Sequence, residues 1–565
     1  MTELLTAMGI IFVIAGIFLL GAHYFRLAVV PAFILAGLVG GPFIDEDSLL
    51  EIAQWGIAFL VFVYTVNLEF GDIRAVLRDS ELAAFVQFIL IAGIGYGLGL
   101  GLGYDTLNAA YLAVAAGLSS TIVGTALMET EARENLVYGR LANSIHFLQD
   151  LIAVLLVLVL VAETFSTEAV GQRLALGLGL LFLAFVISTY LFEYLLRLAE
   201  GSQELLLISS ISILIGFLAI SEYLGISIVV GAFAAGLSIK RDFTRNLGML
   251  NGIQSIRDFF VAIFFVAVGA LVTVPTVEVA LTAILLIVLT VLVKPLIIMA
   301  TLLWEGYDTR EATFTSLNLD QVSEFALIIA IQALILEHIL RELFDAIVLA
   351  AAITMVTSSL TRRHSDRIYR VVSDLGLDRF HGAKTDNRSQ VSSDIDDHVI
   401  IVGFGRIGRE LTAQCEQLGR DFVVIENDPS RLPELREHCA NFVFGDAMHD
   451  YTWEKAQSDS AQLVISTTET TYVSERILEL GIDARIVLRS SDGQAARSLL
   501  RQGVEYVIVP DLLAGEQLRR HLEAVLAGDV DRETLRQSHL DSLDEFERAG
   551  FTSLGKAELD EGQWQ

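Results

Sequence analysis

A carboxylate stands in the middle of a long apolar segment, where a charged side chain is costly. Asp150 lies within residues 140–162, and apolar side chains flank it on both sides. A charge at the centre of a membrane span costs roughly 2.5–3.5 kcal/mol, so such a residue is seldom there without a function. In a partly dehydrated site a carboxylate takes either a proton or a metal cation, and the two compete. Asp150 therefore predicts chemistry that exchanges a cation for a proton.

The apolar segment that precedes it, residues 107–128, carries small and hydroxylated residues at its centre. Ser120 and Thr121 lie in this run, and Gly117 and Gly124 flank them. Such a run lets a helix unwind and present hydroxyls and backbone carbonyls to a cation. Tight helix packing by small residues is the simpler explanation. With a carboxylate in the next segment, we favour Ser120 and Thr121 as cation ligands beside it.

A lysine followed by a proline interrupts residues 278–303. Lys294 lies about nine residues from either end of this apolar run, and Pro295 comes next. The proline removes a backbone donor and frees a carbonyl one turn back. Lys294 could pair with a carboxylate or face the ends of an unwound helix, or its chain could reach the membrane interface. Its depth favours the functional interpretation.

Two further acids and one histidine lie in or at the ends of apolar segments. Glu324 and Gln321 are three residues apart and would share a helix face, and Glu69 ends an earlier segment. Both acids are candidates for the ion site, and a structural role for each is favoured over direct transport. His146 lies four residues before Asp150. It could tune a pH response, but a structural histidine is the favoured interpretation.

The C-terminal part contains a glycine motif in the context that makes it meaningful. A buried strand is expected over residues 398–402, and it runs into Gly403, Gly405 and Gly408 before a helix. The first glycine permits the tight turn, and the second lets backbone amides approach a phosphate. The third lets the helix pack closely on the strand, and the helix N-terminus favours the anion. The pattern predicts a nucleotide site.

Strands that alternate with helical patterns predict a doubly wound parallel sheet around this motif. Glu426 ends the second strand, about twenty residues past the motif, where a ribose hydroxyl would be read. No separate substrate domain follows, so we expect nucleotide binding rather than catalysis. The predicted nucleotide-binding residues are Gly403, Gly405, Arg406, Ile407, Gly408, Glu426, Asn427, Asp446, Ala447, Thr468 and Arg489.

Composition indicates a polytopic membrane protein with a soluble C-terminal part. The chain has 565 residues, of which 54% are hydrophobic, and its formal net charge of −30 has the wrong sign for a nucleic-acid binder. Cys415 and Cys439 give neither a disulfide framework nor metal-ligand spacing. About thirteen apolar segments have nearly the length of a membrane span, and they lie near residues 3–21, 28–44, 52–70, 82–103, 107–128, 140–162, 172–196, 204–221, 224–238, 258–274, 278–303, 312–336 and 342–361.

Basic residues predict the orientation of these segments. With the N-terminus outside, most basic residues fall in inward loops and most acidic ones in outward loops, and an odd number of spans delivers the soluble domain to the cytoplasm. Arg173 and Arg341 are exceptions on the outer side. The inward basic residues are Arg26, Arg74, Arg78, Arg133, Arg140, Arg197, Lys240, Arg241, Arg245, Arg257, Arg310, Arg362, Arg363, Arg367 and Arg370.

These motifs resemble those of a known family over about residues 1–525. The membrane part resembles the Kef-type monovalent cation:proton antiporters (glutathione-regulated potassium-efflux-like), and the soluble part is similar to their RCK N-terminal, or TrkA-N (KTN), domain. The family often has a glycine where Val322-Ser323 stand. The residues that carry the resemblance are Leu118-Ser119-Ser120-Thr121, Gln149-Asp150, Gln321-Val322-Ser323-Glu324-Phe325 and Gly403-Phe404-Gly405-Arg406-Ile407-Gly408.

The resemblance implies inverted repeats with two crossing discontinuous helices, expected at residues 107–128 and 278–303. It implies that Asp150 carries the transported ion and that Gln149 beside it indicates K+/H+ exchange. It also implies a homodimer in the inner membrane of a prokaryote, with AMP or NAD(H) as a structural or regulatory ligand of the soluble domain. A soluble ancillary subunit is possible. The chain lacks the family's long C-terminal extension, so glutathione control is not carried over.

The expected organisation is a membrane domain over residues 1–363, a linker over 364–397, a nucleotide-binding domain over 398–526 and an acidic tail over 527–565. The expected function is K+/H+ antiport, with Na+/H+ antiport on the same scaffold as the alternative. A ligand-gated K+ channel is less favoured, because the chain has no Thr-Val-Gly-Tyr-Gly filter sequence and too many spans. A membrane-bound oxidoreductase is disfavoured by the missing substrate domain.

Overall fold

The protein divides into two compact units in a computed structural model of the chain. One unit holds Met1–Ala132 and Tyr138–Arg379, and the other holds Phe380–Gln565 with the short stretch Arg133–Val137. The residues that the structure describes are 2–25, 29–66, 81–128, 136–160, 167–199, 202–239, 243–374, 388–392, 395–527 and short pieces between 533 and 541.

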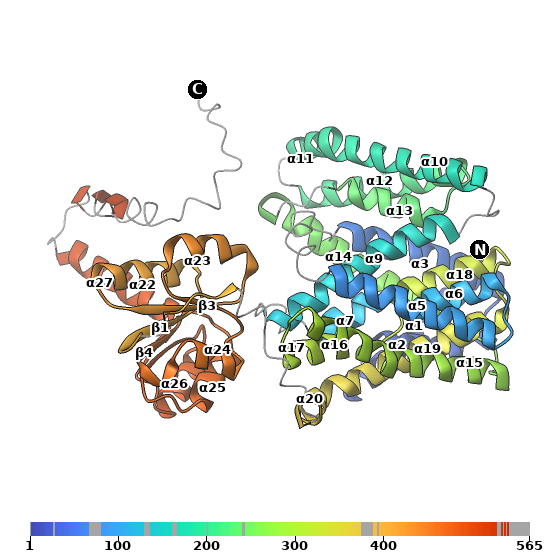
Figure 1. Cartoon of the computed structure of the whole chain (residues 1–565). Helices are drawn as coiled ribbons and strands as arrows, with labels where there is room; N and C mark the ends of the chain where they lie inside the picture. The colour runs from blue at the N-terminus through green and yellow to red at the C-terminus, as the bar shows by residue number, and fades with distance from the viewer. Residues whose placement is uncertain are drawn as a thin grey trace. The chain divides into compact units, whose positions relative to one another are not determined.

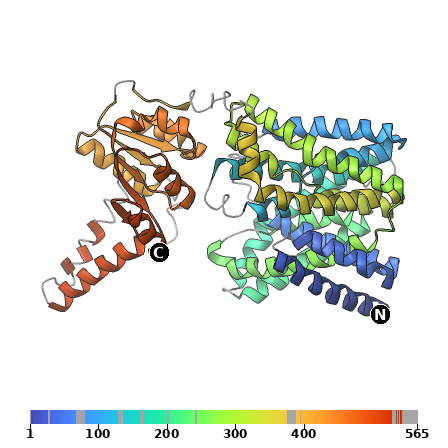
Figure 2. The same cartoon turned by 90° about the horizontal axis from the view of Figure 1, so that it is seen from below.

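The first unit is helical, and its helices lie side by side in two views (Figures 1 and 2). Within it, a first bundle forms around α14, which packs on α2 and α3. Contact between α2 and α14 is close, since a Cβ on Gly37 would lie 2.1 Å from the carbonyl oxygen of Val266 and one on Gly269 would lie 2.1 Å from that of Ile34. The first bundle consists of α1 (Thr2–Phe25), α2 (Val29–Gly40), α3 (Glu46–Val66), α12 (Gln203–Tyr223), α13 (Ile228–Leu237) and α14 (Phe243–Ala270).

A second bundle holds the polar segments that the sequence singles out. Its helices pack chiefly on one another, through the pairs α5 with α6, α15 with α19 and α16 with α17. The second bundle consists of α5 (Glu81–Gly101), α6 (Thr106–Gly117), α7 (Thr121–Leu127), α9 (Val137–Leu160), α15 (Val277–Val288), the π-helical turn η3 (Leu289–Val293), α16 (Lys294–Trp304), α17 (Thr309–Leu317), α18 (Glu324–Ile335) and α19 (Arg341–Arg363).

The remaining helices of this unit flank the two bundles. α10 (Thr167–Val186) continues through a π-helical turn, η2 (Ile187–Phe192), into α11 (Glu193–Leu198), and α10 packs on α13. A short 3-10 helix, η1 (Gly41–Phe43), follows α2, and α20 (Ser365–Asp374) follows α19 and packs on α17.

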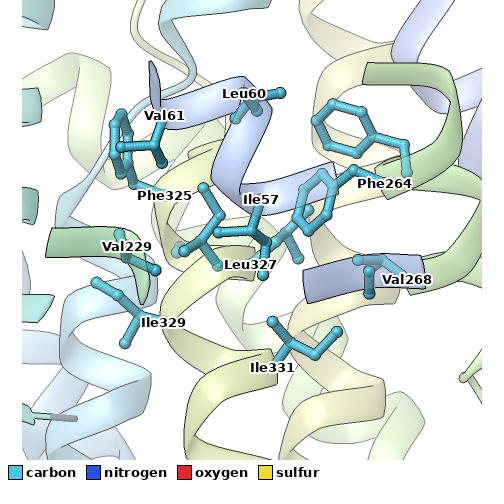
Figure 3. Close-up of a cluster of buried hydrophobic side chains, with 14 of the residues drawn as sticks. Ile57, Leu60, Val61, Val229, Phe264, Val268, Phe325, Leu327, Ile329 and Ile331 are labelled. Carbon is cyan, nitrogen blue, oxygen red and sulfur yellow. The ribbon is translucent and has the colours of Figure 1, made fainter. Parts of the chain in front are cut away.

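An apolar cluster joins the two bundles. Figure 3 shows side chains of α18, such as Phe325 and Leu327, against Val61 and Ile57 of α3 and Phe264 of α14. Each of these five side chains is at least 99% buried. Burial of this apolar surface therefore joins the two bundles.

Eight of the described helices are long and apolar enough to cross a membrane, and four shorter apolar helices accompany them. The expected break within residues 278–303 is wrong. There the chain stays helical from Val277 to Trp304, with a π turn just before Pro295. Proline has no backbone N–H to donate to the preceding turn. The π turn inserts one extra residue into the helix, so the chain accommodates the proline without unwinding.

The second broken span lies instead in the segment expected over 312–336. α17 ends at Leu317, and α18 begins at Glu324. The intervening residues, Asn318 to Ser323, are buried but not helical. The expected break within 107–128 is present, because α6 ends at Gly117 and α7 begins at Thr121.

The second unit contains a parallel six-stranded sheet with the order β3-β2-β1-β4-β5-β6, which confirms the predicted doubly wound α/β fold. Apolar clusters cover both faces of the sheet, as expected for parallel strands. The strands are β1 (His398–Val402), β2 (Phe422–Glu426), β3 (Phe442–Phe444), β4 (Ala461–Ser466), β5 (Arg485–Arg489) and β6 (Tyr506–Ile508).

Helices connect these strands, and an amphipathic helix, α27 (Pro510–Ala527), follows the last strand. Cys415 and Cys439 are free thiols in the core that faces α22, and burial raises the pKa of the Cys439 thiol to about 12. The connecting elements are α22 (Arg406–Gln417), η5 (Pro429–Arg431), α23 (Leu432–His438), α24 (Asp450–Lys455), η6 (Ser458–Ser460), α25 (Thr471–Glu479) and α26 (Gly493–Arg501).

Candidate functional site

Asp150 lies in the middle of α9 and faces the first break. Its side chain is 2% exposed, and the Thr121 hydroxyl donates a hydrogen bond of 2.6 Å to its Oδ2. The side chain of Tyr64, from α3, contacts the same carboxylate. The carboxylate therefore lies between the first residue of α7 and a phenol from the first bundle. The structure brings together Asp150 and Thr121, as the sequence predicts.

The first break is fixed by side chains on both sides. Ser120 caps α7, because its hydroxyl accepts a hydrogen bond from the backbone amide of Val123 at 3.2 Å. The backbone amide of Ser119 donates to Gln149 Oε1 at 2.9 Å. Gln149 thus supplies the acceptor that the unwound chain lacks, which is a bracing role beside the carboxylate.

The second break has the same construction. Ser323 caps α18 by accepting a hydrogen bond from the amide of Phe325 at 3.0 Å. α18 packs on α6, and Asn318, which follows α17, donates to the carbonyl of Gly124 in α7 at 3.0 Å, so the two broken spans meet at their breaks. The Ser119 hydroxyl donates to the carbonyl of Leu319 at 3.0 Å. Gln321 Nε2 donates to the carbonyl of Ser120 at 3.1 Å.

Glu324 joins the starts of the two inner half-helices. It is the first residue of α18, it is 1% exposed, and its Oε1 accepts a hydrogen bond of 3.1 Å from the amide of Ile122 in α7. The Ser120 hydroxyl lies beside the same carboxylate. Both helix N-termini carry partial positive charge, which stabilises an acid there. Asp150 and Glu324 repel each other electrostatically.

Lys294 lies on the opposite side of the crossing, where carbonyls gather. Its side chain is fully buried, and its ammonium donates to the carbonyls of Ala116 at 3.3 Å, Leu118 at 3.0 Å and Gln321 at 3.0 Å. Snorkelling to the interface is therefore wrong for this residue. A cation at the C-terminal end of α6 complements the negative end of that helix dipole.

His146 serves as a structural link, in agreement with the favoured interpretation. Its Nε2 lies 3.0 Å from Asn318 Oδ1, and Asn318 Nδ2 donates to the carbonyl of Gly124 at 3.0 Å. A Cβ on Gly124 would lie 2.2 Å from His146 Nε2, so a glycine is required there. Glu69 lies outside the described residues, and its candidacy is untested.

Sequence reasoning missed three residues of this site. Tyr64, Asn318 and Asp320 are all polar side chains within apolar segments, and Asn318 and Asp320 belong to the second break. The signal was present in the run Asn318-Leu319-Asp320-Gln321, where three of four residues are polar within a long hydrophobic stretch. Two carboxylates, hydroxyls and backbone carbonyls are oxygen ligands of the kind that alkali and other hard cations take.

In the second unit, the glycine motif forms the turn between β1 and α22. Gly403 has φ of +93°, which disfavours any residue with a Cβ. A Cβ on Gly408 would lie 2.0 Å from the carbonyl oxygen of Gly403, so helix and strand need a glycine there. Nothing lies within 4 Å of a Cβ on Gly405, which leaves open space in front of the helix N-terminus. Arg406 is exposed and Ile407 half-buried at the start of α22.

Glu426 organises the backbone beside the motif. Its Oε2 accepts a hydrogen bond from the Phe404 amide at 2.6 Å, and its Oε1 accepts from the amides of Asn427 at 2.7 Å and Asp428 at 2.9 Å. Each carboxylate oxygen has two lone pairs, so this bonding leaves capacity for a hydroxyl. Asn427 is partly exposed at the same strand end.

The other predicted residues lie at the carboxyl ends of neighbouring strands. Asp446 is 2% exposed and accepts from the Met448 amide through Oδ1 at 2.9 Å, and Ala447 beside it is also buried. The Thr468 hydroxyl lies 3.1 Å from that of Ser466. Arg489 donates to the carbonyl of Thr467 at 3.2 Å and pairs with Glu469. Those bonds hold Arg489 at the end of β5 and use part of the hydrogen-bonding capacity of its guanidinium.

Comparison with known proteins supplies matches to both units. The model of the family "Sodium/hydrogen exchanger, transmembrane" matches residues 9–363, and that of the TrkA-N domain matches residues 399–510. A putative cation/proton antiporter, YbaL, of Escherichia coli (strain K12) is 24% identical over 541 residues, covering 91% of this chain and 96% of the relative. The glutathione-regulated potassium-efflux system protein KefC of Enterobacter sp. (strain 638) is 24% identical over 500 residues, covering 85% of this chain and 78% of the relative.

Solved structures match each unit separately. The TrkA-N domain of inner membrane protein YbaL from Escherichia coli is 25% identical, with 23% of this chain and 98% of that one covered and a TM-score of 0.22. The sodium proton antiporter MjNhaP1 from Methanocaldococcus jannaschii is 17% identical, with 64% of this chain and 99% of that one covered and a TM-score of 0.45.

Proposed function

The chain belongs to the sodium/hydrogen exchanger family, and we propose on that premise that it is a secondary antiporter that exchanges cytoplasmic K+ for H+. The matches to a membrane exchanger and a TrkA-N domain confirm the resemblance to the Kef-type cation:proton antiporters. Its helices span the membrane, and its C-terminal unit is the attached α/β domain.

The observation that carries the proposal is the position of Asp150 beside the crossing of two broken helices. Its carboxylate is buried, receives a hydrogen bond from Thr121 and repels Glu324. A bound proton or a bound cation would each relieve this repulsion, so the two are alternative occupants of one site. Ser120 and Gln149 hold the break in place around it. Alternating access of that site to the two sides of the membrane then couples the two fluxes.

K+ is the proposed cation for two reasons. A glutamine precedes the transport aspartate in this chain, and the resemblance associates that pair with K+/H+ exchange. Relatives named as potassium-efflux proteins match 85% of the chain. The alternative is Na+/H+ exchange, which the description of the family names. The same carboxylates would serve either ion.

Proton flux in proteoliposomes decides between these cations. The purified full chain is reconstituted with an internal pH dye, and K+, Na+ or Li+ is added outside in turn. K+-driven alkalinisation or acidification, with little response to Na+ and Li+, is the expected result. A response only to Na+ or Li+ would contradict the K+ assignment and retain antiport. No proton movement with any of the three cations would contradict antiport itself.

We further propose that the C-terminal unit binds an adenine nucleotide, AMP or NAD(H), that regulates transport. The open space at Gly405 and the N-terminus of α22 are suited to a phosphate. The carboxylates of Glu426 and Asp446 are suited to the hydroxyls of a ribose. Gly405→Asp should abolish binding by placing a negative charge where the phosphate lies. Gly493→Asp is a matched control, since Gly493 also begins a helix in open space. Calorimetric titration of each full-length variant with AMP and with NAD(H) measures the affinities. Equal affinity in Gly405→Asp and Gly493→Asp would contradict the assignment.

The proposed assembly is a homodimer in the inner membrane of a prokaryote, with the N-terminus outside and the C-terminal unit in the cytoplasm. The distribution of basic residues supports this orientation, as Arg362 and Arg363 end the last membrane helix before the C-terminal unit. An ancillary soluble subunit is compatible with this arrangement. Site-specific labelling of cysteines placed at the two ends of α19 in intact cells tests the orientation.

A further inference from the structure

The ammonium of Lys294 is a charge of the crossing to which the proposed exchange assigns no role. It is fully buried, and all three of its protons are donated to backbone carbonyls of Ala116, Leu118 and Gln321. Carbonyls satisfy its hydrogen bonds but do not cancel its charge. A buried charge without a counter-charge is strongly unfavourable, so a nearby acid would stabilise the ionised lysine.

Asp320 is the acid in the right place. It precedes Gln321, whose carbonyl accepts a bond from Lys294, and the two side chains attract each other electrostatically. Asp320 is 0% exposed, and neither of its carboxylate oxygens has a hydrogen-bond partner among the described residues, although the hydroxyls of Ser358 and Thr361 lie nearby. Its negative charge is therefore compensated through space by Lys294.

The charges of the crossing thus sort into two groups. Asp150 and Glu324 lie at the N-terminal starts of α7 and α18, where they bond to Thr121 and to the Ile122 amide. Lys294 and Asp320 lie on the other side, where α6 ends and the second break begins. A lysine that is neutralised by its own aspartate has no need to pair with Asp150.

We propose that Asp320 is the fixed counter-charge of Lys294 and that this pair makes exchange at Asp150 electroneutral. This inference rests on the proposed antiport function. If Lys294 had no fixed counter-charge and gave up its own proton when a cation bound at Asp150, two protons would exchange for one monovalent cation, and each cycle would move net charge. With Lys294 held by Asp320, one proton leaves Asp150 for each monovalent cation that binds, and the net charge of the site is the same in both loaded states. Asp320 acts as a positioning residue, because it touches neither ion.

The test measures charge movement and proton flux on the same proteoliposomes. A K+ jump on a solid-supported membrane reports transported charge as current, and an internal dye reports proton flux. The wild-type protein should show K+-driven proton flux without sustained current. Flux accompanied by current in proportion to the rate would overturn the inference while leaving antiport intact, and absence of flux would instead contradict the proposed function.

Variants of the pair provide the second readout. Asp320→Asn and Lys294→Met, each leaving one buried charge uncompensated, should lower flux at least about ten-fold. The double variant Lys294→Met/Asp320→Asn should recover flux to within a few-fold of wild type and remain without current. Asp320→Glu should retain activity, and Asp258→Asn, an exposed aspartate of α14, is the matched control.

Folding of each variant is followed by its elution as a monodisperse peak in detergent. A single variant that fails to fold while the double variant folds would still support the pairing, because only the uncompensated charge differs. A double variant as inactive as Asp320→Asn would overturn it. Unchanged flux in Asp320→Asn would overturn it as well.

Discussion

At the scale of single residues, an acid lies at helix N-termini and a lysine lies at a helix C-terminus in the crossing. Glu324 lies at the N-termini of α7 and α18, and Lys294 lies at the C-terminal end of α6. Sequence alone identified Asp150, Thr121 and Lys294 because a polar residue within an apolar run is conspicuous. Tyr64 was not identified, because a tyrosine in an apolar segment is ordinary and only the fold brings its side chain to Asp150.

A residue of the soluble unit predicts how its stability depends on pH. His398 begins β1, is 0% exposed and contacts the carbonyl of Ala456 through Nε2 at 2.9 Å. Burial lowers the pKa of His398 below its ordinary value of 6.5. The unfolded chain therefore binds more protons between these two pKa values, so this contribution to stability is present above about pH 6.5 and is lost as pH falls towards the folded pKa.

Hydrogen–deuterium exchange of the β1 peptide measures this effect. Protection of residues 398–402 in the full chain should fall more steeply between about pH 7 and pH 5 in the wild type than in His398→Gln, which cannot titrate. Comparison of the two proteins at each pH removes the intrinsic pH dependence of exchange. Parallel pH profiles in the two proteins would show that His398 does not contribute.

At the scale of elements, the two breaks show where sequence patterns succeed and where they fail. The run of glycine, serine and threonine in 107–128 correctly predicts an unwound segment, because those residues cap and flank a helix end. The family resemblance implies a second break within residues 278–303, but a π turn precedes Pro295 there and the helix continues. The true break at Asn318–Ser323 depends on long-range bonds, such as that from Gln321 to Ser120, which local propensity cannot reveal. The parallel sheet, in contrast, is correctly predicted from the alternation of strands and helices.

The segment around Gln390, which precedes the sheet, suggests a route by which nucleotide binding could affect transport. Gln390 pairs with Phe442 of β3 in an antiparallel bridge, with its amide donating to the Phe442 carbonyl at 2.8 Å and its carbonyl accepting at 2.6 Å. β3 leads directly into Asp446, one of the proposed nucleotide ligands. The linker is therefore bonded to the strand that supports the nucleotide site.

Removal of this bridge should uncouple regulation from binding. Gln390→Pro lacks the backbone donor and so loses one of the two hydrogen bonds of the bridge. We expect nucleotide affinity within about two-fold of wild type, while the nucleotide no longer changes the rate of proton flux. Gln390→Ala keeps the backbone bonds and is the control. Full nucleotide control in the proline variant would show that the signal takes another route.

At the scale of the whole membrane unit, the two bundles meet through an apolar cluster, through the contact of Tyr64 with Asp150, and through a group of polar bonds at one end of α19. Asp345 of α19 is 1% exposed and accepts hydrogen bonds from the amide and hydroxyl of Thr273, which follows α14. Arg341 of α19 pairs with Glu46 of α3 and donates to the Leu271 carbonyl. These bonds hold the bundles together at the N-terminal end of α19.

A disulfide at this contact tests whether the bundles must separate there. In a chain with Cys415→Ser and Cys439→Ala, the variant Thr273→Cys/Asp345→Cys should lose most of its flux on oxidation and recover it on reduction. The two single-cysteine variants, oxidised in the same way, control for loss of the Thr273–Asp345 bond itself. Full flux in a quantitatively oxidised double variant would show that this end stays closed throughout the cycle.

Proton release on addition of K+ to the purified protein tests the central role of Asp150 most directly. In weakly buffered detergent solution with a pH dye, the wild-type protein should release about one proton for each cation bound, because both compete for one carboxylate. Asp150→Asn should release none while it remains folded, and Asp258→Asn should behave as wild type. Undiminished K+-dependent proton release from folded Asp150→Asn would contradict the account.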